Sequence, residues 1–505
     1  MDLFNALHVG LASAFQTQNL LYCFIGVFIG TLIGVLPGIG PTAAIAILMP
    51  ATFTLPSVSA IIMLCGIYYG AMYGGSTTSI LVNIPGESAS VVTCIDGYQM
   101  ARQGRAGSAL GISAFGSFIA GIFGIIFLSI LAPTLANVAL GFGPPEYFSL
   151  MILGMTLVIY LGSGSTIKSL ITAGFGIVLG CIGQDPISGV PRLVYGIEVL
   201  WDGLGFAPVI MGLFGISEVL INLEKAEGER EICQTDIKGL LPTKDDWKRA
   251  AKPIARGSVV GFFLGILPGG GATVASFASY ALEKKFSNQP ERFGKGAIEG
   301  VAGPESANNS ATMGAMVPLL TLGIPSNVVM ALLLAALIIH GTPPGPLLLQ
   351  NHPELFWGII ISMFVGNLLL LVLNLPLIGM WVRILRIPYN ILFPLIVLFC
   401  LIGAYSLNSM VSDIFIMLIF GILGYLMKKY EYEGAPLILA FILGPILETN
   451  LRQSLILSHG SLQIFVSRPI SLICLLLAFS FLFFPLVPAY RKLKLRIEEE
   501  EDKQV

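Results

Sequence analysis

Apolar stretches of about 20 residues recur along the whole chain, and shorter polar segments separate them. A helix needs a stretch of this length to cross a bilayer, and the in-and-out alternation typical of a membrane β-barrel is absent. The pattern predicts an all-α integral membrane protein with about 11 spanning helices. We place the spans at residues 59–92, 108–133, 143–162, 167–182, 203–222, 297–340, 355–380, 388–405, 411–427, 434–447 and 469–489.

The composition supports a membrane protein and excludes several other classes. Of the 505 residues, 55% are hydrophobic and 11% are charged, whereas a soluble domain has about 25% charged residues. The net charge of −2 gives no reason to expect nucleic acid as a partner. Seven cysteines without a CxxC pair, and four histidines, predict neither a disulfide framework nor a zinc site. The first residues lack a basic segment, so we expect no cleaved signal peptide.

The basic residues predict the topology. If the spans alternate, all but three of the 27 Lys and Arg residues fall on one side of the membrane, which the positive-inside rule assigns to the cytoplasm. The exceptions are Arg192, Arg452 and Arg468. This arrangement predicts an extracytoplasmic N-terminus and a cytoplasmic C-terminus.

Two apolar segments, residues 23–50 and 257–282, do not fit as crossings. Each contains one copy of a repeated phrase, GVLPGIGPTAA at 34–44 and GILPGGGATVA at 265–275. Proline and glycine break helices, so both phrases predict an interrupted backbone. The first segment has uncharged flanks on both sides, and the second has basic flanks on both sides. We therefore expect two re-entrant helical hairpins that enter from opposite faces, which is an inverted-topology repeat.

A polar, interrupted stretch follows each hairpin. The first is YYGAMYGGSTTSILVNIPGESAS at 68–90, and the second is EGVAGPESANNSATMGAMVPLLTLGIPSNVV at 299–329. We interpret both as discontinuous crossing helices. Irregular backbone is tolerated at membrane depth only where it lines a cavity or is buried in protein, so the four interruptions are expected to meet near the midplane.

Such a meeting point suits a substrate anion and a coupling cation. Helix N-termini offer N–H donors to an anion, and unwound carbonyls offer oxygens to Na⁺. The predicted substrate-binding residues are Pro37, Gly38, Gly40, Thr42, Ser76, Thr77, Thr78, Asn83, Pro85, Gly86, Pro268, Gly269, Gly271, Thr273, Asn308, Asn309, Ser310, Pro325 and Ser326. The candidate Na⁺ ligands are Ser76, Asn308 and Glu305, and the candidate coupling residues are Glu87 and Glu305. The alternative for the two glutamates is a helix N-cap or a carboxylate in a surface loop.

Several of these motifs together resemble the large membrane subunit of the tripartite tricarboxylate transporter family. They are PGIGPTAA, GGSTTSILVNIPGE, IDGYQMARQGRAG, GVAGPESANNSATMGAMVPLLTLGIP and GTPPGP, in that order. Asn327 stands where we expect a small residue in this pattern. The resemblance implies uptake of carboxylates such as citrate across the bacterial inner membrane, driven by a cation gradient, usually Na⁺ (or H⁺). It also implies a small membrane subunit and a periplasmic solute-binding protein as partners, and no further cofactor.

These expectations divide the chain into five parts. They are residues 1–19, an extracytoplasmic segment; 20–222, the first membrane repeat; 223–256, a cytoplasmic polar linker; 257–490, the second repeat with the C-terminal spans; and 491–505, a cytoplasmic tail. The main alternative function is an ion channel with re-entrant pore loops. Neither a phosphate-binding GxxxxGK[ST] nor an HExxH motif occurs, so we expect neither an ATP-driven pump nor an enzyme.

Overall fold

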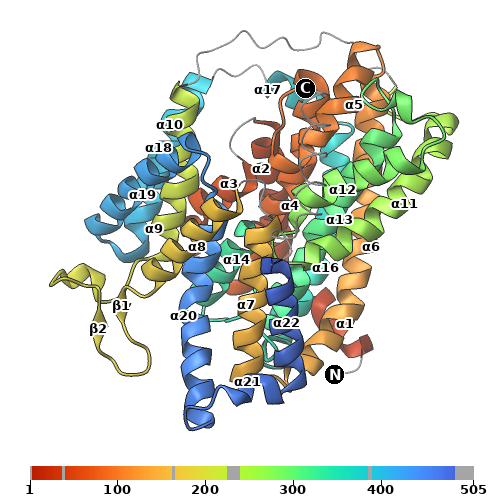
Figure 1. Ribbon diagram of the computed structural model, residues 1–505. Coiled ribbons are helices and arrows are strands. Elements are labelled where there is room, and N and C mark those ends of the chain that lie inside the picture. Colours follow the sequence, from red (N-terminus) through yellow and green to blue (C-terminus); the bar gives the residue numbers. More distant parts are fainter. Residues whose placement is uncertain (1–2, 37–39, 162–164, 225–238, 385–388, 484–505) are drawn as a thin grey trace. The chain divides into compact units, whose positions relative to one another are not determined.

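The chain folds almost entirely into helices in the computed structural model. The structure describes residues 3–36, 40–161, 165–224, 239–384 and 389–483 (Figure 1). Within these ranges the only strands are β1 (Gly183–Gln184) and β2 (Pro191–Arg192), which pair antiparallel. The prediction of an all-α protein is confirmed for this part of the chain.

The helices belong to two compact units. Unit 1 consists of residues 1–140 and 204–434. Its helices are α1 (Leu3–Ala14), α2 (Thr17–Val35), α3 (Gly40–Leu48), η1 (Met49–Thr52), α4 (Ser57–Val82), η2 (Ser88–Ser90), α5 (Val91–Arg102), α6 (Ala106–Ala139), α9 (Phe206–Ile210), η4 (Met211–Ile216), α10 (Ser217–Glu224), α11 (Lys244–Ile266), α12 (Gly271–Phe286), η5 (Pro290–Arg292), α13 (Glu299–Leu322), α14 (Val328–Ile339), α15 (Leu348–Asn351), α16 (Pro353–Asn374), α17 (Ile378–Ile384), α18 (Tyr389–Asn408) and α19 (Val411–Lys429).

Unit 2 consists of residues 141–203 and 435–505. Its elements are the β1–β2 ladder, α7 (Pro144–Leu161), α8 (Thr166–Gly180), η3 (Glu198–Leu200), α20 (Gly434–Leu457), α21 (Gln463–Ser467) and α22 (Pro469–Phe483). The five-part division expected from the sequence remains a prediction.

Six helices are long and apolar enough to cross a membrane, among those described. They are α2, α4, α6, α16, α19 and α20. This number supports a multi-pass membrane protein, while the expected total of about 11 spans remains a prediction. Helix α4 is the most enclosed, with 94% of its apolar window buried inside the protein.

Helix α2 packs against α4 through a row of glycines spaced four residues apart. The row consists of Gly26, Gly30 and Gly34. A Cβ atom at these positions would lie 2.2, 2.5 and 2.2 Å from carbonyl oxygens of α4. Those carbonyls belong, in the same order, to Met63, Ile67 and Ala71. The two backbones run parallel and are so close that no side chain fits between them.

Helices α11 and α13 repeat this packing. The glycine row on α11 consists of Gly257, Gly261 and Gly265, and the facing carbonyls on α13 belong to Gly303, Ala307 and Ala311. The Cβ-to-oxygen distances would be 2.3, 2.2 and 2.1 Å. Each glycine follows its counterpart on α2 by 231 residues, and each facing residue follows its counterpart on α4 by 240 residues. The two Pro-Gly phrases and the NIPG and GIPS motifs show the same two offsets. Unit 1 therefore contains the same helix-packing arrangement twice.

The two copies begin at different ends of unit 1. In the first, the Ser59 hydroxyl near the start of α4 donates to Asn19 near the start of α2. The neighbouring Ser57 hydroxyl donates to the carbonyl of His340, and Thr52 at the end of η1 lies 3.4 Å from the His340 ring. Helix α2 therefore starts, and the α3–η1 segment ends, at what we call the His340 end.

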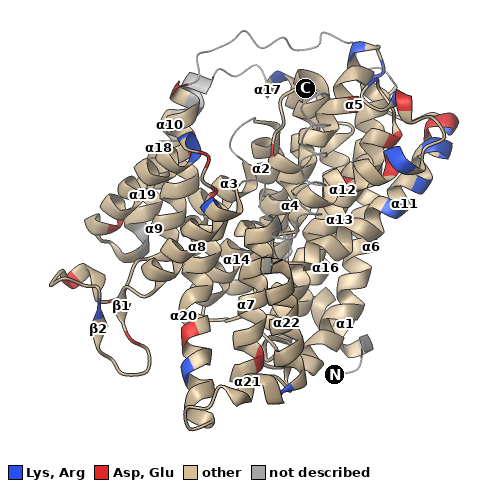
Figure 2. Cartoon of the chain, in the orientation of Figure 1, with Lys and Arg blue, Asp and Glu red and all other residues tan. Residues whose placement is uncertain are grey.

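The second copy begins and ends among charged residues. Asp246 near the start of α11 pairs with Arg105, and Glu283 near the end of α12 pairs with Arg256. We call this the charged end, and Figure 2 shows blue and red segments around α11 and α5, whereas α2, α4 and α14 are free of them. The α2–α3 pair therefore begins and ends at the His340 end of unit 1, and the α11–α12 pair begins and ends at the charged end.

Asp96 of α5 joins the two copies at the charged end. Its carboxylate is fully buried and accepts hydrogen bonds from the backbone N–H groups of Gly296 and Ala297, both at 2.8 Å. It also accepts one from the Tyr280 hydroxyl of α12, at 2.9 Å. One side chain therefore holds α5, α12 and the start of α13 together.

Replacing Asp96 with alanine is expected to lower the free energy of unfolding by about 3 kcal/mol. The change leaves two buried backbone donors without an acceptor, and each such loss costs about 1–3 kcal/mol. Thermal unfolding of the detergent-purified protein measures the effect. Tyr280→Phe removes one donor and leaves the carboxylate bound to both backbone groups, so it should cost clearly less. Equal losses in the two variants would contradict this assignment.

Unit 2 pairs the three cations that do not follow the positive-inside pattern. Arg192 makes a two-pronged contact with Glu448 at 2.7 and 3.1 Å. Arg452 pairs with Asp185 at 2.5 Å, and Arg468 with Glu146 at 3.4 Å. The contact with the Arg452 guanidinium holds the pKa of Asp185 well below its usual value. These cations are neutralised by carboxylates, which explains why they are tolerated away from the other basic residues.

The helix breaks correct one detail of the sequence-based interpretation. The sequence predicts interruptions at the polar runs around Ser76 and Glu305, but both runs lie inside continuous helices, α4 and α13. The interruptions fall only at the NIPGE and GIPSN motifs. In addition, α11 begins at Lys244, so the last part of the predicted polar linker is already helical. The hydroxyl and amide groups of the polar runs form hydrogen bonds with neighbouring buried helices, so the backbone need not unwind.

Candidate functional site

The two helix breaks have the same construction. Asn83 directly follows α4 and Gly323 directly follows α13, and both residues adopt the left-handed conformation, with φ of 57° and 69°. An Ile-Pro pair follows each of them. Four residues after the left-handed position, a side chain caps the next helical segment. Glu87 accepts from the N–H of Ala89 before α5, and Asn327 accepts from the N–H of Met330 in α14.

The turn of the second hairpin contacts both breaks. The N–H of Gly269 donates to the carbonyl oxygen of Ser326 at 2.8 Å. The Thr273 hydroxyl lies 2.8 Å from the hydroxyl of Ser88, which begins the segment after the first break. The α11–α12 hairpin therefore contacts the segment that follows α13 in its own copy and the segment that follows α4 in the other copy.

The turn of the first hairpin lies partly outside the described residues, which include neither Pro37 nor Gly38. Its flanks contact the first break. A Cβ atom on Gly86 would lie 2.1 Å from the carbonyl oxygen of Gly34. The Thr78 hydroxyl donates to the carbonyl of Val35 at 2.7 Å. The end of α2 is therefore held against the first break from both sides.

Glu305 lies at the centre of the cluster. Its side chain is completely buried in the first half of α13. It accepts a hydrogen bond from Ser76 of α4, at 2.5 Å, and another from Thr93 of α5. The hydrogen bonds and ion pairs found for the described residues include no Lys or Arg at this carboxylate. Two neutral donors therefore hold a carboxyl group that three helices enclose.

Glu87 lies beside this group. Its Oε1 accepts from the Asn308 side-chain amide at 3.4 Å, and Asn308 lies three residues after Glu305 on α13. Gly75, next to Ser76 on α4, leaves room for Glu87, because a Cβ there would lie 3.0 Å from its Cγ. The two carboxyl groups are thus gathered around one turn of α4.

Two buried oxygen atoms in the cluster have no hydrogen-bond partner among the described residues. They are Asn308 Oδ1 and Ser326 Oγ. Buried polar atoms are nearly always paired in native proteins, so these oxygens need a partner that the described residues do not supply. The described residues include no group of three or more His, Cys, Asp or Glu that could hold a metal ion. Neutral oxygens beside carboxylates instead suit a hard cation such as Na⁺.

The cluster contains most of the residues predicted from the sequence. The structure gathers around the two breaks Ser76, Asn83, Pro85, Gly86, Gly269, Thr273, Asn308, Pro325 and Ser326, with Glu87 and Glu305. Thr77 follows Ser76 in α4, and Gly40 and Thr42 lie in the first turn of α3. Pro268 lies in the α11–α12 turn, and Gly271 begins α12. Ser310 instead donates to the carbonyl of Ser258 in α11, and Asn309 donates to Ser117 in α6. Those two side chains join helices on another side of α13.

Sequence reasoning missed two members of the cluster. Thr93 donates to Glu305, and Tyr68 accepts from the Asn327 amide at 3.4 Å. No motif surrounds Thr93, which comes from a helix that is remote from Glu305 in the chain. Tyr68 is the first residue of the first polar stretch. Its large phenol side chain in a stretch of mostly small residues was the signal that could have identified it as part of the site.

Replacing Gly269 with valine is expected to abolish function while the protein still inserts. Gly269 has a φ of 78°, which β-branched residues rarely adopt, and its N–H holds Ser326. The strain of about 1–3 kcal/mol should displace the turn from both breaks. Transport by reconstituted protein measures this. Gly294→Val, at a φ of 81° in the connection outside the cluster, is the matched control. Equal activity of both variants would show that the turn needs no fixed geometry.

Comparison with known proteins finds one matching family model and two similar relatives. Residues 20–439 match the family model described as the tripartite tricarboxylate transporter TctA family. A protein of Agrobacterium vitis, described as an uncharacterized 52.8 kDa protein in the TAR-I ttuC' 3' region, is 51% identical over 502 residues, covering 99% of this chain and all of that protein. A second, described as an uncharacterized protein in the TAR-II ttuC' 3' region of the same organism, is 51% identical over 249 residues, covering 48% of this chain and all of that protein. No solved structure matches this chain.

Proposed function

The chain belongs to the tripartite tricarboxylate transporter TctA family, and from this premise we propose that it is a secondary active transporter for carboxylates. In this proposal it takes up tricarboxylates or related anions such as citrate across the bacterial inner membrane. A cation gradient, with Na⁺ favoured over H⁺, drives the uptake. The partners would be a small membrane subunit and a periplasmic solute-binding protein.

The observation that carries the proposal is a pair of buried carboxyl groups, Glu87 and Glu305, that lie at the first helix break without a basic partner among the described residues. The α11–α12 hairpin connects this break to the second one. An ionised carboxylate at membrane depth costs roughly 3 kcal/mol on insertion scales. A bound cation or a proton would remove this cost. The same cation would then attract an anionic substrate to a site that is otherwise built from neutral and acidic side chains. Binding of the cation and of the carboxylate would therefore favour each other.

The opposite origins of the two hairpins favour alternating access. The positive-inside rule places the charged end of unit 1 towards the cytoplasm, which puts the His340 end towards the periplasm. The α2–α3 and α11–α12 pairs would then be re-entrant hairpins from opposite faces, related as an inverted repeat. Each would close the cluster from its own side of the membrane. The proposal retains the periplasmic N-terminus and the cytoplasmic C-terminus that the basic residues of the sequence predict.

Uptake by proteoliposomes that contain all three subunits tests the proposal. Labelled citrate and a labelled dicarboxylate are offered with and without an inward Na⁺ gradient, and separately with a pH gradient. We expect saturable uptake that needs one of the two gradients. Counterflow, in which unlabelled internal substrate accelerates entry of label, separates a carrier from the alternative of an ion channel. Absence of counterflow together with non-saturable flux would favour the channel.

A further inference from the structure

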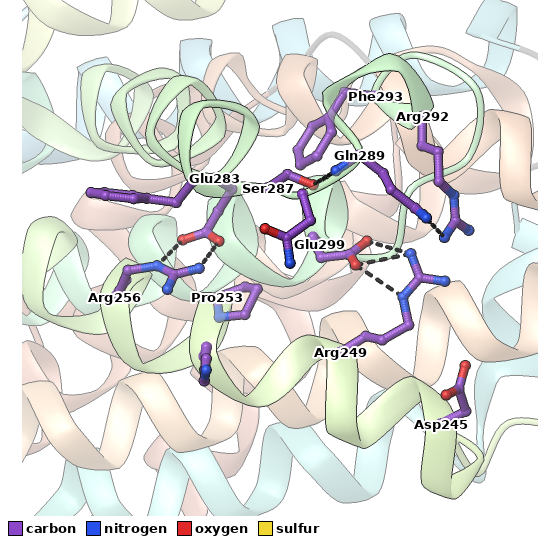
Figure 3. Close-up of a pocket in the computed structure, with 13 residues that line it drawn as sticks. Asp245, Arg249, Pro253, Arg256, Glu283, Ser287, Gln289, Arg292, Phe293 and Glu299 are labelled. Atoms are coloured by element: carbon purple, nitrogen blue, oxygen red, sulfur yellow. Dashed lines mark hydrogen bonds and ion pairs between the residues drawn. The ribbon is translucent and has the colours of Figure 1, made fainter.

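A charged pocket lies at the charged end of unit 1, away from the cluster of helix breaks. It has a volume of about 450 Å³ and lies between α11, the end of α12, the connection with η5 and the start of α13 (Figure 3). This volume is within the range of small-molecule sites. Four basic residues line it, Arg249, Lys252, Arg256 and Arg292, and three acidic ones, Asp245, Glu283 and Glu299. The lining thus has one positive charge in excess.

Two of the three pocket carboxylates, the buried Glu283 and the half-buried Glu299, are already neutralised. Glu283, with 1% of its side chain exposed, receives both Nε and Nη2 of Arg256. Glu299 receives Nε and Nη2 of Arg249 at 2.9 and 3.0 Å. Figure 3 shows each guanidinium group facing its carboxylate, with Arg256 and Glu283 at the left and Arg249 and Glu299 at the right. The pairs fix both arginines, and their remaining N–H groups stay available.

Two basic residues of the pocket have no acidic partner among the described residues. Lys252 is exposed and forms no ion pair with that part of the chain. Arg292 contacts only the neutral Gln289 side chain there, at 3.2 Å. The third carboxylate, Asp245, is exposed at the first turn of α11. The pocket therefore presents unpaired positive charge together with fixed donors, which suits an oxyanion such as a phosphate group.

The helix face that carries these cations continues into an exposed apolar stripe. At 100° per residue, the three basic residues of α11 lie within about 80° of arc with Val259 and Phe263. These apolar side chains are 43% and 54% exposed. One face of α11 thus changes along its length from basic to apolar.

We infer that this pocket binds the phosphate headgroup of an anionic phospholipid, whose acyl chains lie along the apolar stripe. A phosphate with attached hydrocarbon matches both parts of the face, whereas a soluble anion would leave the stripe unused. Basic pockets between membrane helices recognise anionic headgroups by this physics. The site is separate from the cluster around Glu305 and does not depend on which substrate is carried.

The test measures lipid affinity of the purified full-length protein. Dioleoyl phosphatidylglycerol is titrated in detergent and detected by native mass spectrometry, with dioleoyl phosphatidylcholine as the neutral comparison. The double variant Lys252→Gln/Arg292→Gln leaves both ion pairs intact. We expect it to bind phosphatidylglycerol about 30-fold more weakly, because each substitution removes one basic side chain that attracts the headgroup. Phosphatidylcholine binding should not change.

The matched control is Lys248→Gln/Lys285→Gln, which removes the same charge from exposed positions of α11 and α12 outside the pocket. It should retain the affinity of the unaltered protein. Val259→Ser/Phe263→Ser should weaken lipid binding but not binding of glycerol phosphate. An equally large decrease in the control, or no preference for phosphatidylglycerol, would overturn the proposal. Glycerol phosphate bound as tightly as the lipid would assign the pocket to a soluble anion instead.

Discussion

Replacing Gly261 with alanine is expected to destabilise the protein severely, although alanine is the better helix former. Its Cβ would lie 2.2 Å from the carbonyl oxygen of Ala307, so α11 and α13 would have to separate. Backbone atoms cannot rotate away as a side chain would. Overpacking costs about 1–3 kcal/mol, and a contact this short with rigid backbone lies at the upper end of that range, so the cost exceeds the gain in helix propensity of about 1 kcal/mol. The separation would also move the α11–α12 turn away from the helix breaks.

The first copy supplies an independent check of this prediction. Gly30 occupies the corresponding position on α2, where a Cβ would lie 2.5 Å from the carbonyl of Ile67. Gly30→Ala should therefore destabilise the protein in the same way. Gly174, in the middle of α8, has no heavy atom within 4 Å of its Cβ position, so Gly174→Ala should be neutral or slightly stabilising. Thermal unfolding in detergent compares the three variants, and a stable Gly261→Ala protein would contradict the close helix contact.

The duplication could be predicted from the sequence because it depends on short-range signals. Proline and glycine break a helix wherever they occur, so the two Pro-Gly phrases located the turns after α2 and α11. The NIPG and GIPS motifs located the two left-handed residues, Asn83 and Gly323. The glycine rows have the same spacing of four residues and the same offset of 231. They could not be recognised in advance, because glycines in membrane helices serve packing of every kind.

The contacts of the cluster could not be predicted, because they join segments that are far apart in the chain. Polar runs such as STTS and ESANN look like interruptions when each helix is considered alone. In the protein, Ser76 satisfies Glu305 across 229 residues, and Thr93 does so across 212. The polar groups satisfy each other between buried helices, so both helices stay continuous. Asn327 is a further case, since its role as the cap of α14 depends on the break before it.

The most informative single change is Glu305→Gln, which should uncouple transport from the cation gradient. The amide keeps the shape of the side chain and can still accept one of the two hydroxyl hydrogen bonds, from Ser76 or Thr93. It removes the negative charge that we propose a cation or proton neutralises. A loss of roughly 3 kcal/mol of cation binding corresponds to about 100-fold weaker affinity. Gradient-driven uptake should therefore fail, while counterflow of labelled substrate continues.

The way in which the Na⁺ and pH dependence of uptake changes in the Glu305→Gln variant identifies the coupling ion. If Na⁺ binds at Glu305, the variant should need about 100-fold more Na⁺ for half-maximal uptake, at every pH. If Glu305 carries a proton, the variant should instead lose the pH dependence of uptake. Glu354→Gln, at the exposed start of α16, removes the same charge far from the cluster in sequence and should change neither property. A Glu305→Gln protein with unaltered dependence on Na⁺ and on pH would make Glu305 a structural hydrogen-bond acceptor, because an ion that balances its charge cannot be indifferent to the removal of that charge.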